Sequence, residues 1–160
     1  MPRYKTPVSV LVLIHTPDLH VLLIERAAHP GFWQSVTGSR EGDETLLETA
    51  RREVAEETGI LAECSALSDW QQSNCFEIFP QWRHRYAPGV THNVEHIFSL
   101  CVPAICPVQL APNEHRAFQW LPAEEAARHC FSWTNRDAIQ ALIARAAEKN
   151  HEPSPEIPAG

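Results

Sequence analysis

The chain has 160 residues, of which 44% are hydrophobic and 21% are charged, a balance that suits one folded domain and excludes a largely disordered protein. Its 13 lysine and arginine residues stand against 20 aspartate and glutamate residues, which gives a net charge of −7. Duplex binding needs many cations, and no apolar run reaches the roughly 18 residues of a membrane span. We therefore expect no nucleic-acid or membrane partner, and nothing in the sequence indicates an obligate protein partner.

Short apolar runs dominate the first part of the chain. The runs at 8–14 and 21–24 are bounded by polar and turn residues, which favours buried strands. The first run could mimic a signal-peptide core, but no small-residue cleavage site follows it. We interpret it as a strand of a cytoplasmic protein. A third strand is predicted at 32–37, ended by Gly38.

A helix is predicted next, because Thr45-x-x-Glu48 forms a capping box. The helix should run to about Thr58, and Gly59 stands at the position where a helix usually stops.

The second half of the chain adds further strands and two helices. Prolines at 103 and 107 make 104–110 a loop or an edge strand. Residues 150–160 hold three prolines and are predicted to be a disordered tail, which leaves 1–149 as a single domain. The pattern predicts an α/β fold, α+β by some schemes, with a mixed sheet and covering helices. The predicted strands are 76–79, 94–102 and 118–121, and the predicted helices are 123–129, with Pro122 just inside it, and 135–149.

The predicted helix at 45–58 is unusually acidic. Seven of the eighteen residues from Arg40 to Glu57 are acidic, and like charges at helical spacing destabilise a helix. A divalent cation would neutralise them, and oxygen ligands select a hard ion such as Mg²⁺, or Mn²⁺. An ordinary solvated Glu/Arg helix is the alternative. We expect Arg52 to pair with Glu48, four residues before it. The carboxylates that share one helix face, beside the apolar stripe, are Glu53, Glu56 and Glu57.

The order of these residues carries more information than the composition. Gly38, five residues, Glu44, seven residues and then Arg52 to Ile60 (REVAEETGI) resembles the Nudix box in full. The resemblance implies an α/β/α sandwich with a mixed sheet, which hydrolyses a nucleoside diphosphate linked to a further group. It also implies Mg²⁺ bound by the glutamates of the box. The catalytic residues implied are Glu44, Arg52, Glu53 and Glu57, and the metal-site residues are Gly38, Glu53, Glu56 and Glu57.

Outside the box, the stretches 32–39, 84–91 and 132–139 resemble one subfamily, the dihydroneopterin triphosphate diphosphatases of bacterial folate synthesis. That resemblance implies hydrolysis of 7,8-dihydroneopterin triphosphate to the monophosphate and diphosphate. A purine and a pterin are similar fused rings, so a dATP-type nucleoside triphosphate is the alternative substrate. A binding module that has lost catalysis is a third possibility, but none of the box glutamates is missing.

Several further residues are expected to bind the substrate. Lys5 and Arg26 lie at strand ends, where they can reach the phosphates, and the basic cluster 83–85 suits phosphate too. Ser132 would meet a ligand or cap the last helix. The expected substrate-binding residues are Lys5, Arg26, Thr37, Ile78, Phe79, Pro80, Gln81 and Ser132.

One more carboxylate commonly completes the metal site of this family. Glu114, in a loop before a strand, is preferred to Glu95, which lies within a strand. The segment 92–96 also fits the H-x-x-E-H pattern of zinc peptidases. On a strand, however, four residues span about 13 Å, too far for both histidines to bind one zinc.

Overall fold

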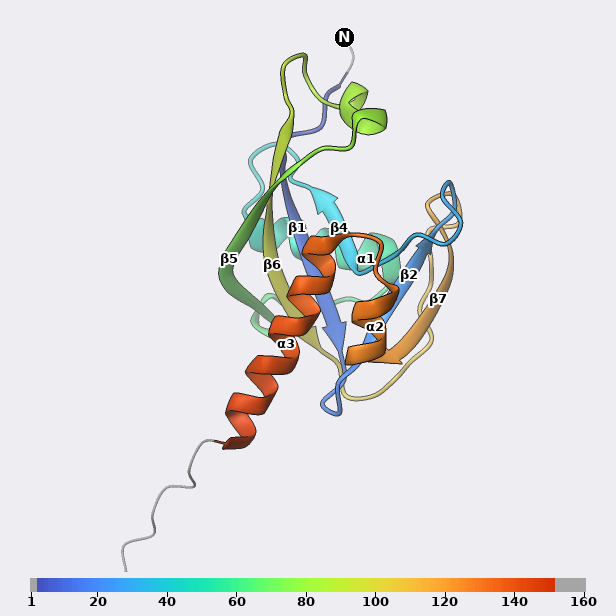
Figure 1. The fold of residues 1–160 in the computed structure, drawn as a ribbon, viewed down its shortest axis with the longest axis vertical. Helices are drawn as coiled ribbons and strands as arrows, with labels where there is room; N and C mark the ends of the chain where they lie inside the picture. The colour runs from blue at the N-terminus through green and yellow to red at the C-terminus, as the bar shows by residue number, and fades with distance from the viewer. Residues whose placement is uncertain (1–2, 152–160) are drawn as a thin grey trace, which may run out of the picture.

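A computed structural model describes residues 3–151 of the chain. Seven strands form one mixed sheet with the order β3-β2-β1-β6-β5, in which β4 also pairs with β1 and β7 with β2 (Figure 1). Among the named strands of the described residues, only β1 and β6 pair in parallel. The strands are β1 (Val8–His15), β2 (His20–Arg26), β3 (Trp33–Gln34), β4 (Val36–Ser39), β5 (Leu67–Glu77), β6 (His92–Cys101) and β7 (His115–Pro122).

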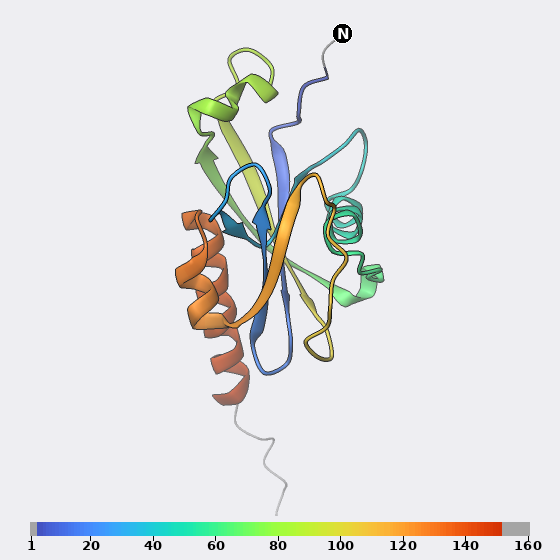
Figure 2. The ribbon, with the colours of Figure 1, turned by 90° about the vertical axis from the view of Figure 1, so that its right-hand side faces the viewer.

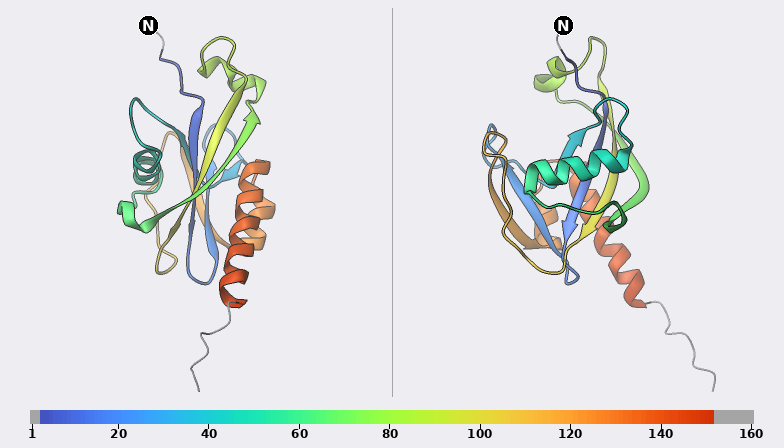
Figure 3. Two further views of the ribbon diagram at one scale, coloured as in Figure 1. Left: turned by 90° about the vertical axis from the view of Figure 1, so that its left-hand side faces the viewer. Right: turned by 180° about the vertical axis from the view of Figure 1, so that it is seen from behind.

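Helices cover both faces of the sheet. Figure 2 shows α1 (Leu46–Thr58) on one side of the strands and both α2 (Ala123–His129) and α3 (Trp133–His151) on the other. Seen from behind, α1 lies across the strands (Figure 3). The described residues also include two 3-10 helices, η1 (Cys64–Ala66) and η2 (Pro80–Arg85).

Strand β1 shows why the layers form. Its side chains alternate between the two faces, so Val10 and Val12 pack with Val54 of α1, whereas Leu11 packs with Ile139 of α3. The predicted α/β/α sandwich with a mixed sheet is therefore confirmed. The run that resembled a signal-peptide core is this central, buried strand. Among the described residues, no helix has the length and apolar character of a membrane span.

The predicted helix at 45–58 is confirmed, together with both of its ends. The Thr45 hydroxyl accepts from Glu48 N at 3.1 Å, and the Glu48 carboxylate accepts from Thr45 N at 3.3 Å. Gly59 follows the helix with a φ of +75°, a left-handed conformation that favours glycine.

The predicted strand at 32–37 is wrong in its extent. It is divided into β3 and β4 at Ser35, and Gly38 lies inside β4 instead of ending the strand. Ser35 N–H donates to Asn135 Oδ1 at 2.7 Å, and Asn135 Nδ2 donates to Ser35 Oγ at 3.0 Å. Because the backbone of Ser35 bonds to a side chain of α3, it leaves the ladder between neighbouring strands.

The strand expected at 76–79 is also wrong in its extent, since only Phe76 and Glu77 lie in β5, which occupies 67–77 and ends before Ile78. Strand β5 lies at the sheet edge, its side chains are mostly exposed, and its register shifts between Asp69 and Ser73. The usual alternation of apolar and polar residues is therefore absent from its sequence.

The remaining elements agree with expectation, with small shifts at their ends. Strand β6 corresponds to the strand predicted at 94–102, and β7 corresponds to the one predicted at 118–121. Residues 104–110 form a loop. Helix α2 has the predicted bounds, although Pro122 is its N-cap and not its first residue. Helix α3 continues to His151, so the predicted domain boundary at 149 falls inside it, and the rest of the predicted tail lies outside the described residues.

Candidate functional site

The carboxylate of Glu53 lies directly against strand β4. Glu53 is 9% exposed, and a Cβ built onto Gly38 would overlap its carboxyl group. Glycine is needed at position 38 because any side chain there would displace Glu53. Burial raises the pKa of Glu53 to about 7, despite the opposing charge of Arg52.

Glu57 follows one helical turn later and is more deeply buried, at 4% exposure. Its Oε2 accepts from the backbone N–H of Thr37 at 3.1 Å. Burial, followed by the charge of Glu53, raises the pKa of Glu57 well above its ordinary value. Two neighbouring carboxylates are thus held inside the protein, on the side of α1 that faces the sheet.

Arg52 links the acidic residues around it. Its Nε donates to Glu44 Oε2 at 2.7 Å, and its Nη2 donates to Glu44 Oε1 at 3.0 Å and to Ser39 O at 2.9 Å. Its Nη1 donates to Glu53 Oε1 at 2.7 Å and to the exposed Glu56 at 3.3 Å. The hydrogen bonds from Arg52 lower the pKa of Glu44 to about 2. Arg52 therefore fixes the orientation of Glu53 relative to the loop that precedes α1.

The expected pair of Arg52 with Glu48 is not formed. The Glu48 carboxylate accepts from the backbone of Thr45, and the guanidinium instead reaches back to Glu44, eight residues earlier. The capping box competes for Glu48, and the loop brings Glu44 within reach.

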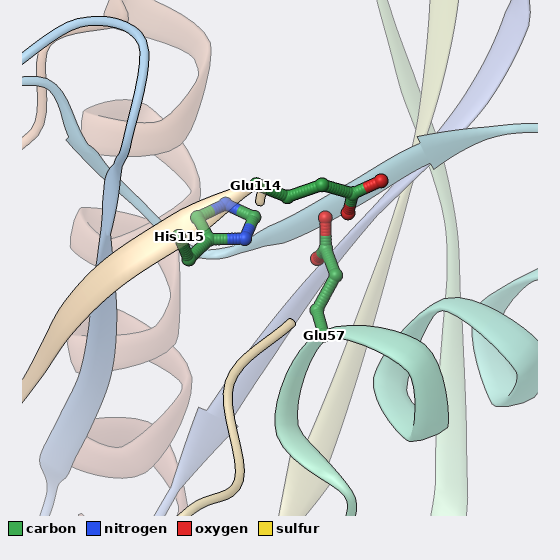
Figure 4. A group of neighbouring side chains, drawn as sticks. All are labelled: Glu57, Glu114 and His115. Atoms are coloured by element: carbon green, nitrogen blue, oxygen red, sulfur yellow. The ribbon is translucent and has the colours of Figure 1, made fainter. Parts of the chain in front are cut away.

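Two residues at the start of β7 complete the acidic group: Glu114 in the turn before the strand and His115 as its first residue. One ligand atom from each of Glu57, Glu114 and His115 lies within 4.8 Å of the other two. Figure 4 shows the carboxylates of Glu57 and Glu114 directed toward each other, with the imidazole of His115 beside them. His115 is buried, its Nδ1 has no hydrogen-bond partner among the described residues, and burial lowers its pKa to about 4. Neutral imidazole and carboxylates are both metal ligands, so the donor set fits a divalent cation.

His115 was not predicted, although it is adjacent to Glu114 in the sequence. A histidine next to a candidate carboxylate was the available signal, but only the fold places its ring beside Glu57.

Glu95 lies elsewhere. It pairs with Ser9 across the parallel β1–β6 ladder and therefore shares the face of Leu11 and Ile97, which α2 and α3 cover. The α1 carboxylates lie on the opposite face. The structure thus brings Glu114, and not Glu95, to the acidic group. His92 and His96 lie in β6, so the helix that a zinc peptidase motif requires is absent from this segment.

Three cations gather at the end of the sheet near this group. The guanidiniums of Arg26 and Arg85 lie 4.7 and 5.8 Å from the ring centre of Trp82, and Lys5 N donates to Arg85 O at 2.8 Å. Burial and the charges of the two arginines lower the pKa of Lys5. Among the described residues, these three cations form no ion pair within 4.0 Å. In contrast, Arg83 pairs with Glu77.

The other predicted substrate residues have mixed placements. The Thr37 hydroxyl donates to Val10 O at 2.9 Å, so its proton is already committed within the sheet. Ser132 Oγ accepts from Asn135 N at 3.1 Å and therefore caps α3, the second of its two expected roles. Residues 78 and 79 join β5 to η2, and Pro80 and Gln81 are the first residues of η2. Of these four, Ile78 is buried and the other three are exposed.

The chain is similar to known proteins in both sequence and fold. A NUDIX domain model matches residues 5–142. The chain is 48% identical over 147 residues to dihydroneopterin triphosphate diphosphatase of Escherichia coli K12, covering 90% of this chain and 97% of that protein. It is 43% identical over 152 residues to the Haemophilus influenzae protein of the same name, with 89% and 91% covered. The solved E. coli dihydroneopterin triphosphate pyrophosphohydrolase superposes with a TM-score of 0.83 at 46% identity, covering 89% of this chain and 98% of that chain.

The two candidate carboxylates outside α1 can be separated by mutation. Glu114→Gln should weaken the apparent affinity for Mg²⁺ by about tenfold or more, whereas Glu95→Gln should leave it unchanged, because only Glu114 lies beside Glu57. The measurement is a Mg²⁺ titration of each variant followed by thermal shift. The reverse ranking would contradict the assignment of Glu114 to the metal site.

Stabilisation by metal should depend on pH. In the metal-free protein, burial holds the pKa of Glu53 at about 7 and that of Glu57 also above the ordinary 4.5. The protonated forms of Glu53 and Glu57 are therefore compatible with burial, and the stability associated with them is fully present below the unfolded-state pKa of about 4.5. This stability is lost as the pH rises through the pKa values of the folded protein. A cation needs ionised carboxylates, so the increase in Tm caused by Mg²⁺, relative to EDTA, should be larger at pH 8 than at pH 5.5. An equal increase at both pH values would contradict this account.

Proposed function

The chain belongs to the Nudix family, and from that membership we propose that it hydrolyses 7,8-dihydroneopterin triphosphate to dihydroneopterin monophosphate and diphosphate, a step of folate biosynthesis. Enzymes of this family hydrolyse phosphorus anhydrides with a divalent metal, and we propose Mg²⁺, with Mn²⁺ as a substitute. The relatives that support this substrate match nearly the full chain. We also infer a cytoplasmic location, since residues 8–14 form a buried strand.

One observation carries the proposal: a group formed by the buried Glu57 and His115 and the exposed Glu114 lies close to cations that have no ion-pair partner among the described residues. Arg26 pairs with His115 across the β2–β7 ladder, and Ala27 N donates to Glu114 O at 2.9 Å, so the two groups adjoin. A triphosphate with its metal ion carries both signs of charge. The carboxylates match the metal ion, and the neighbouring cations match the phosphates. Neither group alone would bind such a ligand well, because each would repel part of it.

Each residue of the site has a proposed role. Glu53, Glu56, Glu57 and Glu114 would hold the divalent cation, with His115 as a further candidate ligand. The cation neutralises phosphate oxygens and activates water when bound. Arg52 positions Glu53 through a 2.7 Å hydrogen bond and is itself anchored on Glu44. Gly38 keeps β4 close enough for this arrangement. We propose the predicted substrate-binding set without Thr37 and Ser132, whose hydroxyls bond within the protein. Arg85 joins Lys5 and Arg26 as a phosphate contact.

The dATP-type diphosphatase remains the alternative within the same class, because the phosphate site does not distinguish a pterin from a purine. A catalytically silent module is disfavoured, since every carboxylate of the box is present and oriented.

Turnover of a substrate panel tests the function. With Mg²⁺, the protein should release diphosphate from dihydroneopterin triphosphate with a higher kcat/KM than from dATP. Glu57→Gln should lower the rate by at least about 10²-fold with an unchanged circular dichroism spectrum, because it removes a buried metal ligand. Faster turnover of dATP would favour the alternative substrate. No diphosphate release from either compound would indicate the silent module.

The cations should affect binding and leave folding nearly unchanged. Lys5→Ala and Arg26→Ala should each raise KM by roughly tenfold or more, as expected for charge-assisted contacts to phosphate. Their free energies of unfolding should change by less than about 1 kcal/mol, because neither side chain has an ion-pair partner to lose among the described residues. Lys149→Ala, which removes an exposed positive charge from α3, is the matched control. An unfolded variant, or an unchanged KM, would assign that residue to the scaffold.

A further inference from the structure

The sheet face opposite α1 carries an unexpected group of polar side chains. Ser9 pairs with Ser39 on one side and with Glu95 on the other, so all three point to the face that α3 covers. Asn93, two residues before Glu95, shares this face. Ser9, Asn93 and Glu95 are 5%, 3% and 6% exposed. Strands covered on both faces are normally apolar, so these polar residues need a reason.

Two acceptor atoms in this group have no partner. Glu95 Oε1 and Asn93 Oδ1 are buried and make no hydrogen bond among the described residues. Asn93 Nδ2 does bond, donating to Ser9 Oγ at 2.7 Å, and in this orientation of the amide Oδ1 has no partner among the described residues. Unsatisfied buried acceptors cost free energy, and burial raises the pKa of Glu95 to about 7. Both atoms would be satisfied by a ligand that offers N–H donors.

Hydroxyl groups at the start of α3 lie beside Glu95. Asn135 N donates to Ser132 Oγ at 3.1 Å, and Ser132 Oγ lies 3.1 Å from Thr134 Oγ1. Burial raises the pKa of Glu95, and the Thr134 hydroxyl acts in the opposite direction. The predicted substrate residue Ser132 is thus linked to Glu95 through Thr134.

The polar group adjoins the phosphate-binding cations. Lys5 N donates to Arg85 O at 2.8 Å, and Val94 N, between Asn93 and Glu95, donates to Pro7 O at 3.0 Å. Residues 5–7 thus join the segment of the cations to the strand that carries Glu95. We expect a ligand whose phosphates lie at Arg85 to direct its ring toward Glu95.

We propose that Glu95, with Asn93 beside it, recognises the ring of the substrate by accepting hydrogen bonds from its pyrimidinone edge. The inference rests on the proposed function. A pterin presents two adjacent donors there, the ring N3–H and the 2-amino group, and a carboxylate accepts two parallel N–H bonds. Adenine presents one donor beside one acceptor at the corresponding edge. The acceptor nitrogen of adenine would face a carboxylate oxygen, and the two acceptors would repel each other. Glu95 thereby selects a pterin over adenine.

Glu95→Gln tests this role with almost no change in shape. The amide replaces one acceptor by a donor, which matches adenine better than a pterin. We expect kcat/KM for dihydroneopterin triphosphate to fall by about tenfold or more, while that for dATP is unchanged or rises. The Tm should not fall, because the amide oxygen can still accept from Thr134 and no buried charge remains. Glu148→Gln, at an exposed site of α3, controls for the lost charge.

Equilibrium binding of neopterin, followed by its own fluorescence, separates this inference from the proposed function. Neopterin has the same pyrimidinone edge and needs no turnover. Wild-type protein that binds neopterin about tenfold more tightly than Glu95→Gln supports the role of Glu95, even if no triphosphate is hydrolysed. Equal binding by the two proteins, with an unchanged preference between the two triphosphates, would overturn it. A lowered Tm with equal losses for both triphosphates would also overturn it, since that result indicates a structural role.

Discussion

The burial of Glu53 and Glu57 against strand β4 is the constraint on which the rest of the site depends. Removing two neighbouring carboxylates from water is unfavourable unless they are paired or protonated, and their raised pKa values express that cost. Gly38 makes room for one carboxylate, the Thr37 N–H bonds the other, and Arg52 compensates part of the charge. A divalent cation would offset the remaining unfavourable free energy of burying the two carboxylates. Metal binding and stability are therefore linked through Glu53 and Glu57.

A single sheet separates two kinds of chemistry at this end of the molecule. Along β4, Gly38 faces the carboxylates of α1, whereas Ser39 faces the polar group that contains Glu95. This division follows from the alternation of side chains in a strand, and a slip of one residue would exchange the two faces. The register between β1 and β4 therefore determines both where a metal can bind and where a ring can be recognised. Stability and specificity share one structural cause.

The cations are organised by an aromatic residue and not by acidic partners. Trp82, on η2, lies within 5.8 Å of two guanidiniums, and cation–π contact offsets part of their mutual repulsion without neutralising them. Their positive charge thus stays available to a polyanion. An ion pair, like that of Arg83 with Glu77, would have cancelled it.

The sequence by itself determined the features that depend on residues close together in the chain. The capping box, the glycine stop and the shared face of Glu53, Glu56 and Glu57 follow from helical spacing, and the buried strands follow from their apolar runs. Only the tertiary structure decided which distant residues meet. It paired Arg52 with Glu44, brought Glu114 and His115 to Glu57, and placed Glu95 on the other face. Loop conformation and strand register determine these contacts, and neither can be inferred from the spacing of neighbouring residues in the sequence.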